Sequence, residues 1–211
     1  MENNFKKEIL GKFNRNFWVQ EMKERLERGE LEPFSDLVSK EEYLEAFKQY
    51  FGDIENLQGK KYLDVGAGFG SGLHELMKQF GVEVINADVV PEAIKLLKEQ
   101  SEAGIIADIF KLPIKDGVLD GAISLNLMNT GAFKDIDDMK SGFEEINRVI
   151  KNGGYFIQSH FGYMGNPILI EDQLRVLDSA GFYNIQLIEN QMAKELPKLE
   201  SLAFIAEKKP L

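Results

Sequence analysis

A glycine-rich segment that follows a short apolar run is the part of the sequence best suited to bind a small polar ligand. It reads Asp64-Val-Gly66-Ala-Gly68-Phe-Gly70-Ser-Gly72 and precedes a stretch with the helical pattern. Glycines at a strand-to-helix turn let a ligand lie against the backbone without interference from a Cβ atom, and the helix N-terminus offers free N–H donors. An acid at this position disfavours a pyrophosphate and favours a cationic amino acid group. The segment therefore predicts a site for a ligand that carries such a cation.

Two further acidic residues follow the next two strands expected along the chain. Asp88 ends the run VEVINAD, 22 residues after Gly66, and Asp108 follows Ala107 at the end of the run GIIAD. Both acids are expected at the same site as Asp64, an expectation that comes from the family resemblance carried by the glycine segment. The structural alternative is that they are solvated strand-end acids or loop caps, which are common roles for Asp.

The run Asp-x-Gly-x-Gly-x-Gly resembles the first motif of class I S-adenosylmethionine-dependent methyltransferases, and the resemblance extends over residues 60–208. The segment FEEINRVIKNGGYF, from Phe143 to Phe156, is similar to the family's helix, Lys-x-Gly-Gly turn and fifth strand. Ser179 to Phe182 is similar to its late-helix turn. The resemblance implies S-adenosylmethionine as the cofactor, with an acid on the ribose hydroxyls and another on the adenine amino group. The implied cofactor-binding residues are Asp64, Gly66, Ala67, Gly68, Gly70, Asp88, Val89, Ala107, Asp108, Ile109 and Asn126.

The family's reaction is an in-line displacement at the sulfonium methyl group, so the protein chiefly supplies proximity and alignment. A base is needed as well if the acceptor is a hydroxyl or a protonated amine. His160, directly after a predicted strand, is the candidate base, although a structural histidine is the commoner case. Tyr163 is a second candidate for contact with the substrate, whereas His74, one turn into the helix behind the glycines, is more readily explained as structural.

Beyond residue 60, short apolar runs alternate with amphipathic stretches, which predicts βαβ units and a mostly parallel sheet. The expected strands are 62–66, 82–88, 104–108, 119–126, 154–160, 184–189 and 202–208, and the expected helices are 71–80, 91–100, 136–150 and 170–180. The last two strands are joined by a segment too short for the usual crossover helix, so we expect them to pair antiparallel at the sheet edge. The predicted fold class is α/β, a doubly wound, Rossmann-like, seven-stranded sheet, mostly parallel with the last strand antiparallel.

The first part of the chain is rich in Lys, Glu and aromatic residues and shows no strand pattern. It predicts a helical cap or lid over residues 1–58, followed by the methyltransferase domain at 59–211. One helix should end at Gly29, and a second should run from a cap at Ser39 to Gly52. Aromatic side chains at helical spacing are expected to pack the cap against the sheet rather than to line a pocket. They are Phe13, Phe17, Tyr43, Phe47 and Phe51, while Trp18 and Tyr50 lie off the stripe and are the better candidates for an acceptor pocket.

Composition narrows the range of partners. The formal net charge of -10 and a pI near 4.9 disfavour nucleic acid as a substrate. The chain has no cysteine, which excludes disulfides and thiolate metal sites and is compatible with a reducing compartment. No apolar run approaches the roughly 20 residues needed to span a bilayer. We therefore expect a cytoplasmic enzyme without a metal, a membrane or a nucleic acid partner, which methylates a small-molecule acceptor.

Three other functions remain compatible with these residues. A protein or RNA methyltransferase would need a basic groove beside the donor site. A non-catalytic, nucleoside-binding protein of the same fold would need no base. A nicotinamide-dependent oxidoreductase would use the glycine segment for a pyrophosphate, against which Asp64 argues. The sequence determines neither the acceptor nor the oligomeric state.

Overall fold

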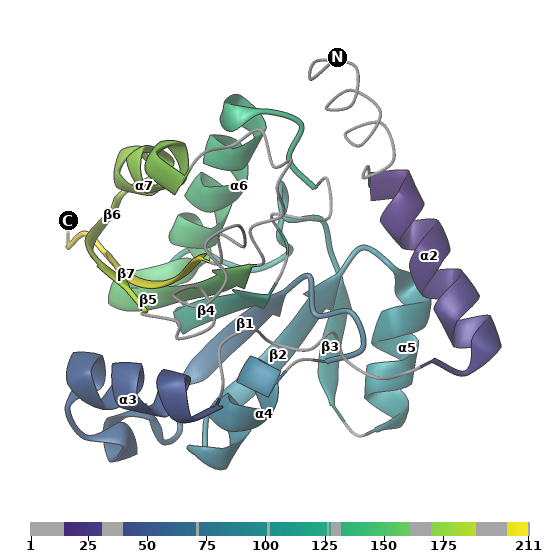
Figure 1. Ribbon diagram of the computed structural model, residues 1–211, viewed down its shortest axis with the longest axis horizontal. Coiled ribbons are helices and arrows are strands. Elements are labelled where there is room, and N and C mark those ends of the chain that lie inside the picture. The colour runs from purple at the N-terminus through teal and green to yellow at the C-terminus, as the bar shows by residue number, and fades with distance from the viewer. Residues whose placement is uncertain are drawn as a thin grey trace, which may run out of the picture.

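The computed structural model describes residues 15–30, 40–70, 72–100, 102–125, 127, 132–160, 170–188 and 202–210. Within these residues the chain forms a seven-stranded sheet of order β3-β2-β1-β4-β5-β7-β6 (Figure 1). The strands are β1 (Lys61–Val65), β2 (Glu83–Asp88), β3 (Ala103–Ile106), β4 (Leu119–Leu125), β5 (Ile150–His160), β6 (Phe182–Leu187) and β7 (Leu202–Lys208). Neighbouring strands are parallel except where β7 pairs with β5 and with β6. The predicted sheet, mostly parallel with the last strand antiparallel, is confirmed.

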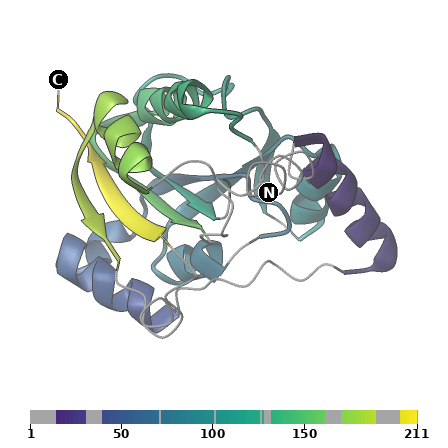
Figure 2. The same ribbon diagram turned by 45° about the horizontal axis from the view of Figure 1, so that its top comes forward.

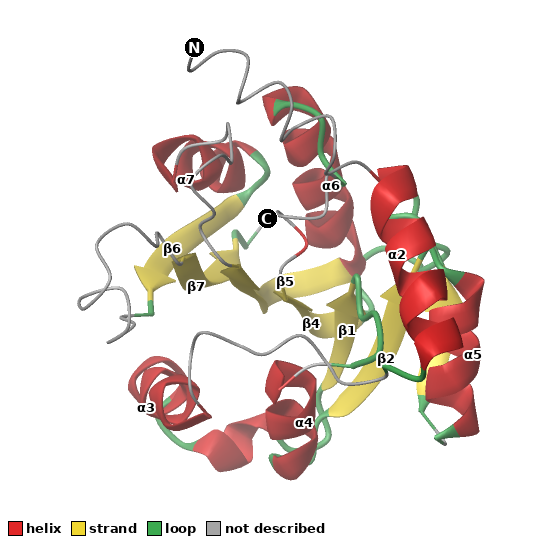
Figure 3. Cartoon of the chain, turned by 45° about the vertical axis from the view of Figure 1, so that its right-hand side comes forward, coloured by secondary structure: helices red, strands yellow, loops and turns green. Residues whose placement is uncertain are grey.

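Helices cover both faces of this sheet, which is the doubly wound arrangement (Figure 3). They are α2 (Arg15–Arg28), α3 (Lys40–Phe51), α4 (Gly72–Gln79), α5 (Pro91–Glu99), α6 (Ile136–Val149) and α7 (Ile170–Ser179), with a short 3-10 helix at Ile54–Leu57. On one face, α6 and α7 bury Phe143 and Leu177 in a cluster with Phe156 of β5. On the other face, α3 and α4 bury Phe47 and Met77 with Tyr62 of β1. None of the helices in the described part of the chain is long and apolar enough to cross a membrane.

The two amino-terminal helices lie at opposite ends of the sheet (Figure 2). Helix α3 contributes Tyr43 and Phe47 to the core beneath α4, where their rings lie 5.9 Å apart, so the packing role expected for these two residues is confirmed. Helix α2 contacts instead the loop after β1 and the start of α5, through a cluster that includes Met22 and Phe69. Phe13 lies outside the described residues, as do the side chains of the other aromatic candidates, Phe17, Trp18, Tyr50 and Phe51. The division of the chain at residue 58 stays a prediction.

The order of the last two strands differs in detail from the prediction. They pair antiparallel as expected, but β7 lies between β5 and β6, so only β6 is at the edge. The reason is burial: Ala203 to Ala206 of β7 are all buried, whereas β6 alternates and leaves Leu187 exposed. A strand that is apolar on both faces is stable inside a sheet, and a half-polar strand is suited to its edge.

Arg148 of α6 ties this helix to the loop that leads into β4. Its guanidinium donates hydrogen bonds to the backbone oxygens of Ile114, at 2.8 Å, and Leu112, at 3.1 Å. The same group pairs with the carboxylates of Glu145, at 2.7 and 2.8 Å, and Asp116. These contacts raise the pKa of Arg148 above its already high value, so the charge is permanent.

Replacing Arg148 with methionine is expected to lower the free energy of unfolding by about 2 kcal/mol, because several charge-assisted hydrogen bonds are lost together. Urea denaturation followed by circular dichroism measures this change. The matched control is Arg175→Met, since Arg175 is mostly exposed and pairs on its own helix with Asp172. Such a surface pair is worth at most about 1 kcal/mol. An equal effect of both substitutions would show that the Arg148 contacts add nothing.

Candidate active site

The glycine segment forms a loop that folds back onto the carboxyl end of β2. The amides of Gly66 and Ala67 both donate to the backbone oxygen of Ala87, at 2.8 and 3.1 Å, and the amide of Gly70 donates to Ala67, at 2.8 Å. These backbone hydrogen bonds hold the start of the loop against the end of β2. The loop lies where β1 and β2 end, the place at which ligands bind in open α/β sheets.

Two of the glycines have a structural reason to be glycine. Gly66 has φ of 73°, a left-handed conformation that side chains disfavour, and a Cβ there would lie 3.0 Å from Leu127 Cδ1. Gly68 has φ of 53°, and a Cβ there would lie 3.5 Å from Met22 Cε of α2. The left-handed backbone therefore accounts for glycine at both positions, and space is short as well only at Gly66, because 3.5 Å is an ordinary contact distance.

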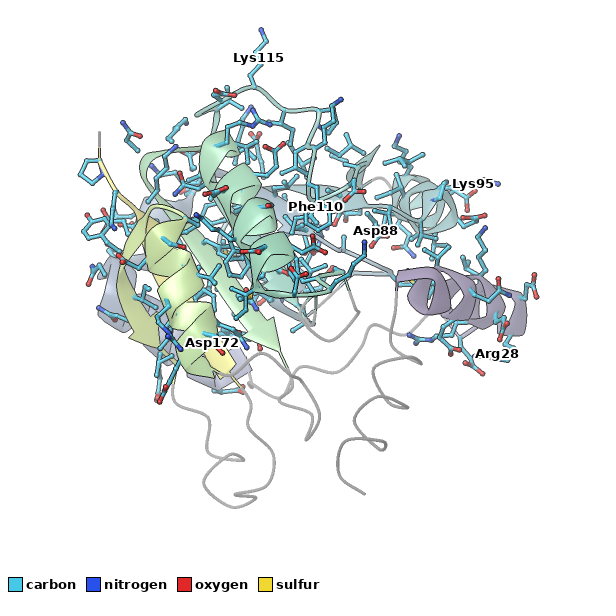
Figure 4. All side chains as sticks on the ribbon, turned by 90° about the horizontal axis from the view of Figure 1, so that it is seen from above. Arg28, Asp88, Lys95, Phe110, Lys115 and Asp172 are labelled. Atoms are coloured by element: carbon cyan, nitrogen blue, oxygen red, sulfur yellow. The ribbon has the colours of Figure 1, made fainter. Side chains whose placement is uncertain are left out.

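Asp88, at the end of β2, holds the loop from the other side. Its Oδ2 accepts the amide of Gly68 at 2.9 Å, and its Oδ1 accepts the amide of Val90 at 2.9 Å. The side chain is 8% exposed, and Figure 4 shows it between α6 on one side and α2 and α5 on the other. Burial raises the pKa of Asp88, and the hydrogen bonds from Val90 and Gly68 offset this only in part. A carboxylate in this place can accept further hydrogen bonds from a polar ligand.

Asp64 lies below the loop and is 1% exposed. Among the described residues, none donates a hydrogen bond to its Oδ2. The nearest cationic group is the ring of His74, whose Nδ1 lies 3.5 Å from that oxygen. Sequence reasoning regarded His74 as structural and missed this pairing, because the rotation of a helix relative to a strand cannot be read from spacing alone. A buried carboxylate with one oxygen that accepts no hydrogen bond from the described residues fits a ligand with an ammonium group.

The third strand supplies Asp108 in a tight turn. The backbone amide of Ala107 donates to the backbone oxygen of Asp88, at 2.9 Å, so the two strand ends are adjacent. Asp108 Oδ1 accepts the amide of Phe110 at 3.2 Å, the loop-capping role that was the structural alternative. The side chain of Ile109 is buried in the core beneath α6. Contact of these residues with the cofactor stays a prediction.

Helix α2 covers one side of the loop. Its residue Met22 forms a buried cluster with Phe69 of the loop and with Val90 and Ala93 at the start of α5, while Val89 packs against the same cluster. The guanidinium carbon of Arg25, also on α2, lies 5.5 Å from the centre of the Phe69 ring. One side of the loop is therefore covered by a helix near the amino-terminal end of the described chain.

The remaining candidates cannot be placed as side chains. His160 ends β5 at the carboxyl edge and pairs with Leu202, but its side chain is outside the described part of the structure, as are Asn126 and Tyr163. The structure thus brings together the acids of β1, β2 and β3 and leaves the catalytic candidates as predictions. The covering role of Met22 was not predicted, because the spacing of residues on a helix does not show what the helix packs against.

Comparison with known proteins gives a family match and similar folds. Residues 63–158 match the family model described as methyltransferase domain. A search of the curated proteins found no match. Among solved structures, the chain is similar to 1,6-didemethyltoxoflavin-N1-methyltransferase of Burkholderia thailandensis, crystallised with 1,6-didemethyltoxoflavin and S-adenosylhomocysteine. That similarity has a TM-score of 0.64 at 16% identity and covers 93% of this chain and 87% of that one.

Two other similar structures come from different organisms. One is a SAM-dependent methyltransferase of Methanosarcina mazei, with a TM-score of 0.59, 17% identity, and coverage of 73% of this chain and 94% of that one. The other is geranyl diphosphate C-methyltransferase of Streptomyces coelicolor A3(2), with a TM-score of 0.56, 12% identity, and coverage of 78% and 79%. At such identities the likeness concerns the fold.

Proposed function

Since residues 63–158 match the methyltransferase-domain model, we propose that this chain is a class I S-adenosylmethionine-dependent methyltransferase that methylates a nitrogen or oxygen atom of a small-molecule acceptor. The cofactor is S-adenosylmethionine. The acceptor class rests on one observation above all, the covering of one side of the glycine loop by α2 through Met22 and Phe69. A helix packed on the loop leaves less room for a folded macromolecule than an open loop would.

The residues of the site suit the cofactor. Asp64 offers a buried carboxylate for its ammonium group, and the loop from Gly66 to Gly70 offers a backbone without side chains. In this proposal Asp88 accepts hydrogen bonds from the ribose hydroxyls and Asp108 contacts the adenine amino group. Ala67, Val89, Ala107, Ile109 and Asn126 complete the set. When bound, the cofactor supplies an electrophilic methyl group on a sulfonium ion.

The protein's own contribution to the reaction is alignment, exclusion of water and acceptance of a proton. The fixed loop and Asp88 orient the donor site, and α2 shields it from solvent, which strengthens the electrostatic interactions inside. His160 is the proposed base for an acceptor that must lose a proton, and Tyr163 the proposed acceptor contact. Residues 1–58 act in this view as a cap on the domain formed by 59–211.

Charge and similarity support the same acceptor class. The net charge of -10 disfavours RNA, and the similar structure from Burkholderia thailandensis is named for a small heteroaromatic acceptor methylated at nitrogen. The structure from Streptomyces coelicolor is named as a C-methyltransferase, so the acceptor atom has to be determined by experiment. The absence of cysteine favours a cytoplasmic location for the enzyme.

The proposal is tested by following S-adenosylhomocysteine formation with a panel of acceptors. Small amines, heteroaromatic nitrogen compounds and phenols are compared with cellular protein and RNA fractions. We expect turnover with at least one small molecule and none with the macromolecular fractions. Methylation of protein or RNA alone would overturn the acceptor class, and calorimetric binding of NAD without binding of S-adenosylhomocysteine would overturn the donor.

A suitable reference for this assay is Asp178→Asn. Asp178 is exposed and pairs with Lys209 at the far end of α7, so this variant should retain the turnover of the wild type. Loss of turnover there would mean that the assay reports stability and not the site.

A further inference from the structure

His74 lies in the first turns of α4 with both ring nitrogens facing carboxylates. Its side chain is 2% exposed. Nδ1 lies 3.5 Å from Asp64 Oδ2, and Nε2 lies 3.6 Å from Glu102 Oε2. Glu102 precedes β3. The imidazole of His74 therefore lies between two carboxylates from different parts of the chain, Asp64 of β1 and Glu102.

The row of charged groups that begins with Asp64 and His74 extends through Glu102 and Lys78 to the surface. The side chain of Glu102 is 17% exposed and accepts a hydrogen bond from Lys78 Nζ, whose side chain is 39% exposed. The other charged groups nearby are Glu75, which interacts with Lys78 on α4, and Asp88 of β2, which interacts with Asp64. Of these charges, Asp64 and Glu102 favour the protonated imidazole and Lys78 opposes it.

The protonation state follows from this geometry. A neutral imidazole carries one N–H and presents it to only one of the two carboxylates, whereas the imidazolium presents an N–H to each and its charge is attracted to both. Burial by itself lowers the pKa of His74, but the carboxylates of Asp64 and Glu102 outweigh it, and the pKa of His74 is raised above 6.5. The two carboxylates therefore favour the protonated form of the ring in the free protein.

A protonated His74 neutralises the carboxylate that a cationic ligand would use. Asp64 is buried, so its charge is screened little by water and acts strongly on its neighbours. An imidazolium next to it and an ammonium group above it compete for the same negative charge. When His74 loses its proton, the charge of Asp64 becomes fully available to the ligand.

We propose that His74 is a positioning residue that controls the charge Asp64 presents to the donor, so that affinity for S-adenosylmethionine increases as His74 loses its proton. The inference rests on the proposed role of Asp64 in binding the donor. By linkage, donor binding expels the proton of His74 and lowers its pKa. We expect the loss of the His74 proton to increase donor affinity about 5- to 10-fold, which is typical of coupling between two sites.

The test measures the dissociation constant of S-adenosylmethionine by calorimetry between pH 6.0 and 8.5 for the wild type and for His74→Gln. The ratio of the two constants cancels the titration of the donor's own amino group. We expect this ratio to change about 5- to 10-fold across the range. The control ligand is 5′-methylthioadenosine, which lacks the amino acid part, and its ratio should not vary with pH. In Glu102→Gln the pH midpoint should move down, because one carboxylate that favours the imidazolium is gone.

A second measurement needs no variant of His74. The chain has two histidines, so the His74 ring signal can be assigned by nuclear magnetic resonance with His160→Gln as reference. Saturating donor should lower the pKa of His74. The free energy of unfolding of the free protein should decrease with pH, whereas donor affinity should increase. A raised histidine pKa stabilises the fold fully below pH 6.5, and this contribution is lost as the pH rises through the raised value.

The outcomes separate the two proposals. A wild type that binds both ligands, with a pH-independent ratio for S-adenosylmethionine or an unchanged His74 pKa, would overturn the role of His74 alone. An equal pH dependence for 5′-methylthioadenosine would also overturn it, because that ligand has no ammonium group. A wild type that binds neither ligand at any pH would overturn both the donor site and the inference.

Discussion

Replacing Asp88 with alanine is expected to weaken S-adenosylhomocysteine binding by about 10- to 100-fold, since hydrogen bonds to a charged group contribute about 1.5–3 kcal/mol each. The proposed partners are the ribose hydroxyls. The substitution also removes the acceptor of the Gly68 and Val90 amides, which hold the loop at 2.9 Å each. Isothermal calorimetry at neutral pH measures the loss of affinity.

A thermodynamic cycle, in which the protein and the ligand are changed separately and together, distinguishes contact of Asp88 with the ribose from support of the loop by Asp88. Asp88→Asn keeps one oxygen as an acceptor, and the 2′-deoxy analogue of S-adenosylhomocysteine removes one hydroxyl. If Asp88 binds the ribose, the two changes together should cost less than their sum, because they remove the same contact. Strict additivity would mean that Asp88 only supports the loop. Asp135→Asn is the control for the loss of charge at a carboxylate that accepts a backbone amide, since Asp135 caps α6 through the amide of Asp138.

The largest expected effect on stability comes from Gly121, in the middle of β4. A Cβ there would lie 2.3 Å from Tyr62 Cε1 and 2.5 Å from the backbone oxygen of Tyr155. Gly121 pairs with both residues, so neighbouring strands fix it on each side, and the Tyr62 side chain is only 1% exposed. Gly121→Ala should therefore lower the free energy of unfolding by about 3 kcal/mol or more. Urea denaturation measures it.

The matched control is the same change at Gly104 in edge strand β3. A Cβ there would lie 3.1 Å from Cγ2 of Ile94, which would have to move by only a few tenths of an ångström. Its cost should be below about 1 kcal/mol, because alanine also reduces the entropy of the unfolded chain. If both variants were equally stable, the ring of Tyr62 would have to move freely, and the tight contact would carry no energy.

The sequence was most informative about helices and strands, because the spacing of apolar residues follows the periodicity of the backbone. Helical and strand periods predicted all seven strands and the helices between them, because burial of one face imposes the same spacing wherever it occurs. Asp88 was predicted from its place at a strand end, and the structure puts its carboxylate within hydrogen-bonding distance of the Gly68 amide. Parallel topology brings such strand ends together whatever the loops contain.

Other features depend on contacts between elements, which spacing does not encode. The pairing of His74 with Asp64 requires the rotation of α4 over β1, and the close approach of Tyr62 to Gly121 requires the register of β1 against β4. The position of β7 was readable in part, since LAFIA is apolar on both faces. Asn126, Tyr163 and the side chain of His160 are outside the described residues, so the catalytic half of the site stays a prediction.

The place of β7 has a consequence for how the chain folds as it is synthesised. Strand β6 pairs with β7 and with no other described strand, so residues 182–187 have no partner in the sheet until 202–208 have left the ribosome. The parallel strands from β3 to β5 can associate earlier, because they are complete by His160. The nascent protein therefore exposes the β5 edge for the time needed to add some forty residues, the interval in which binding by a chaperone would protect it best.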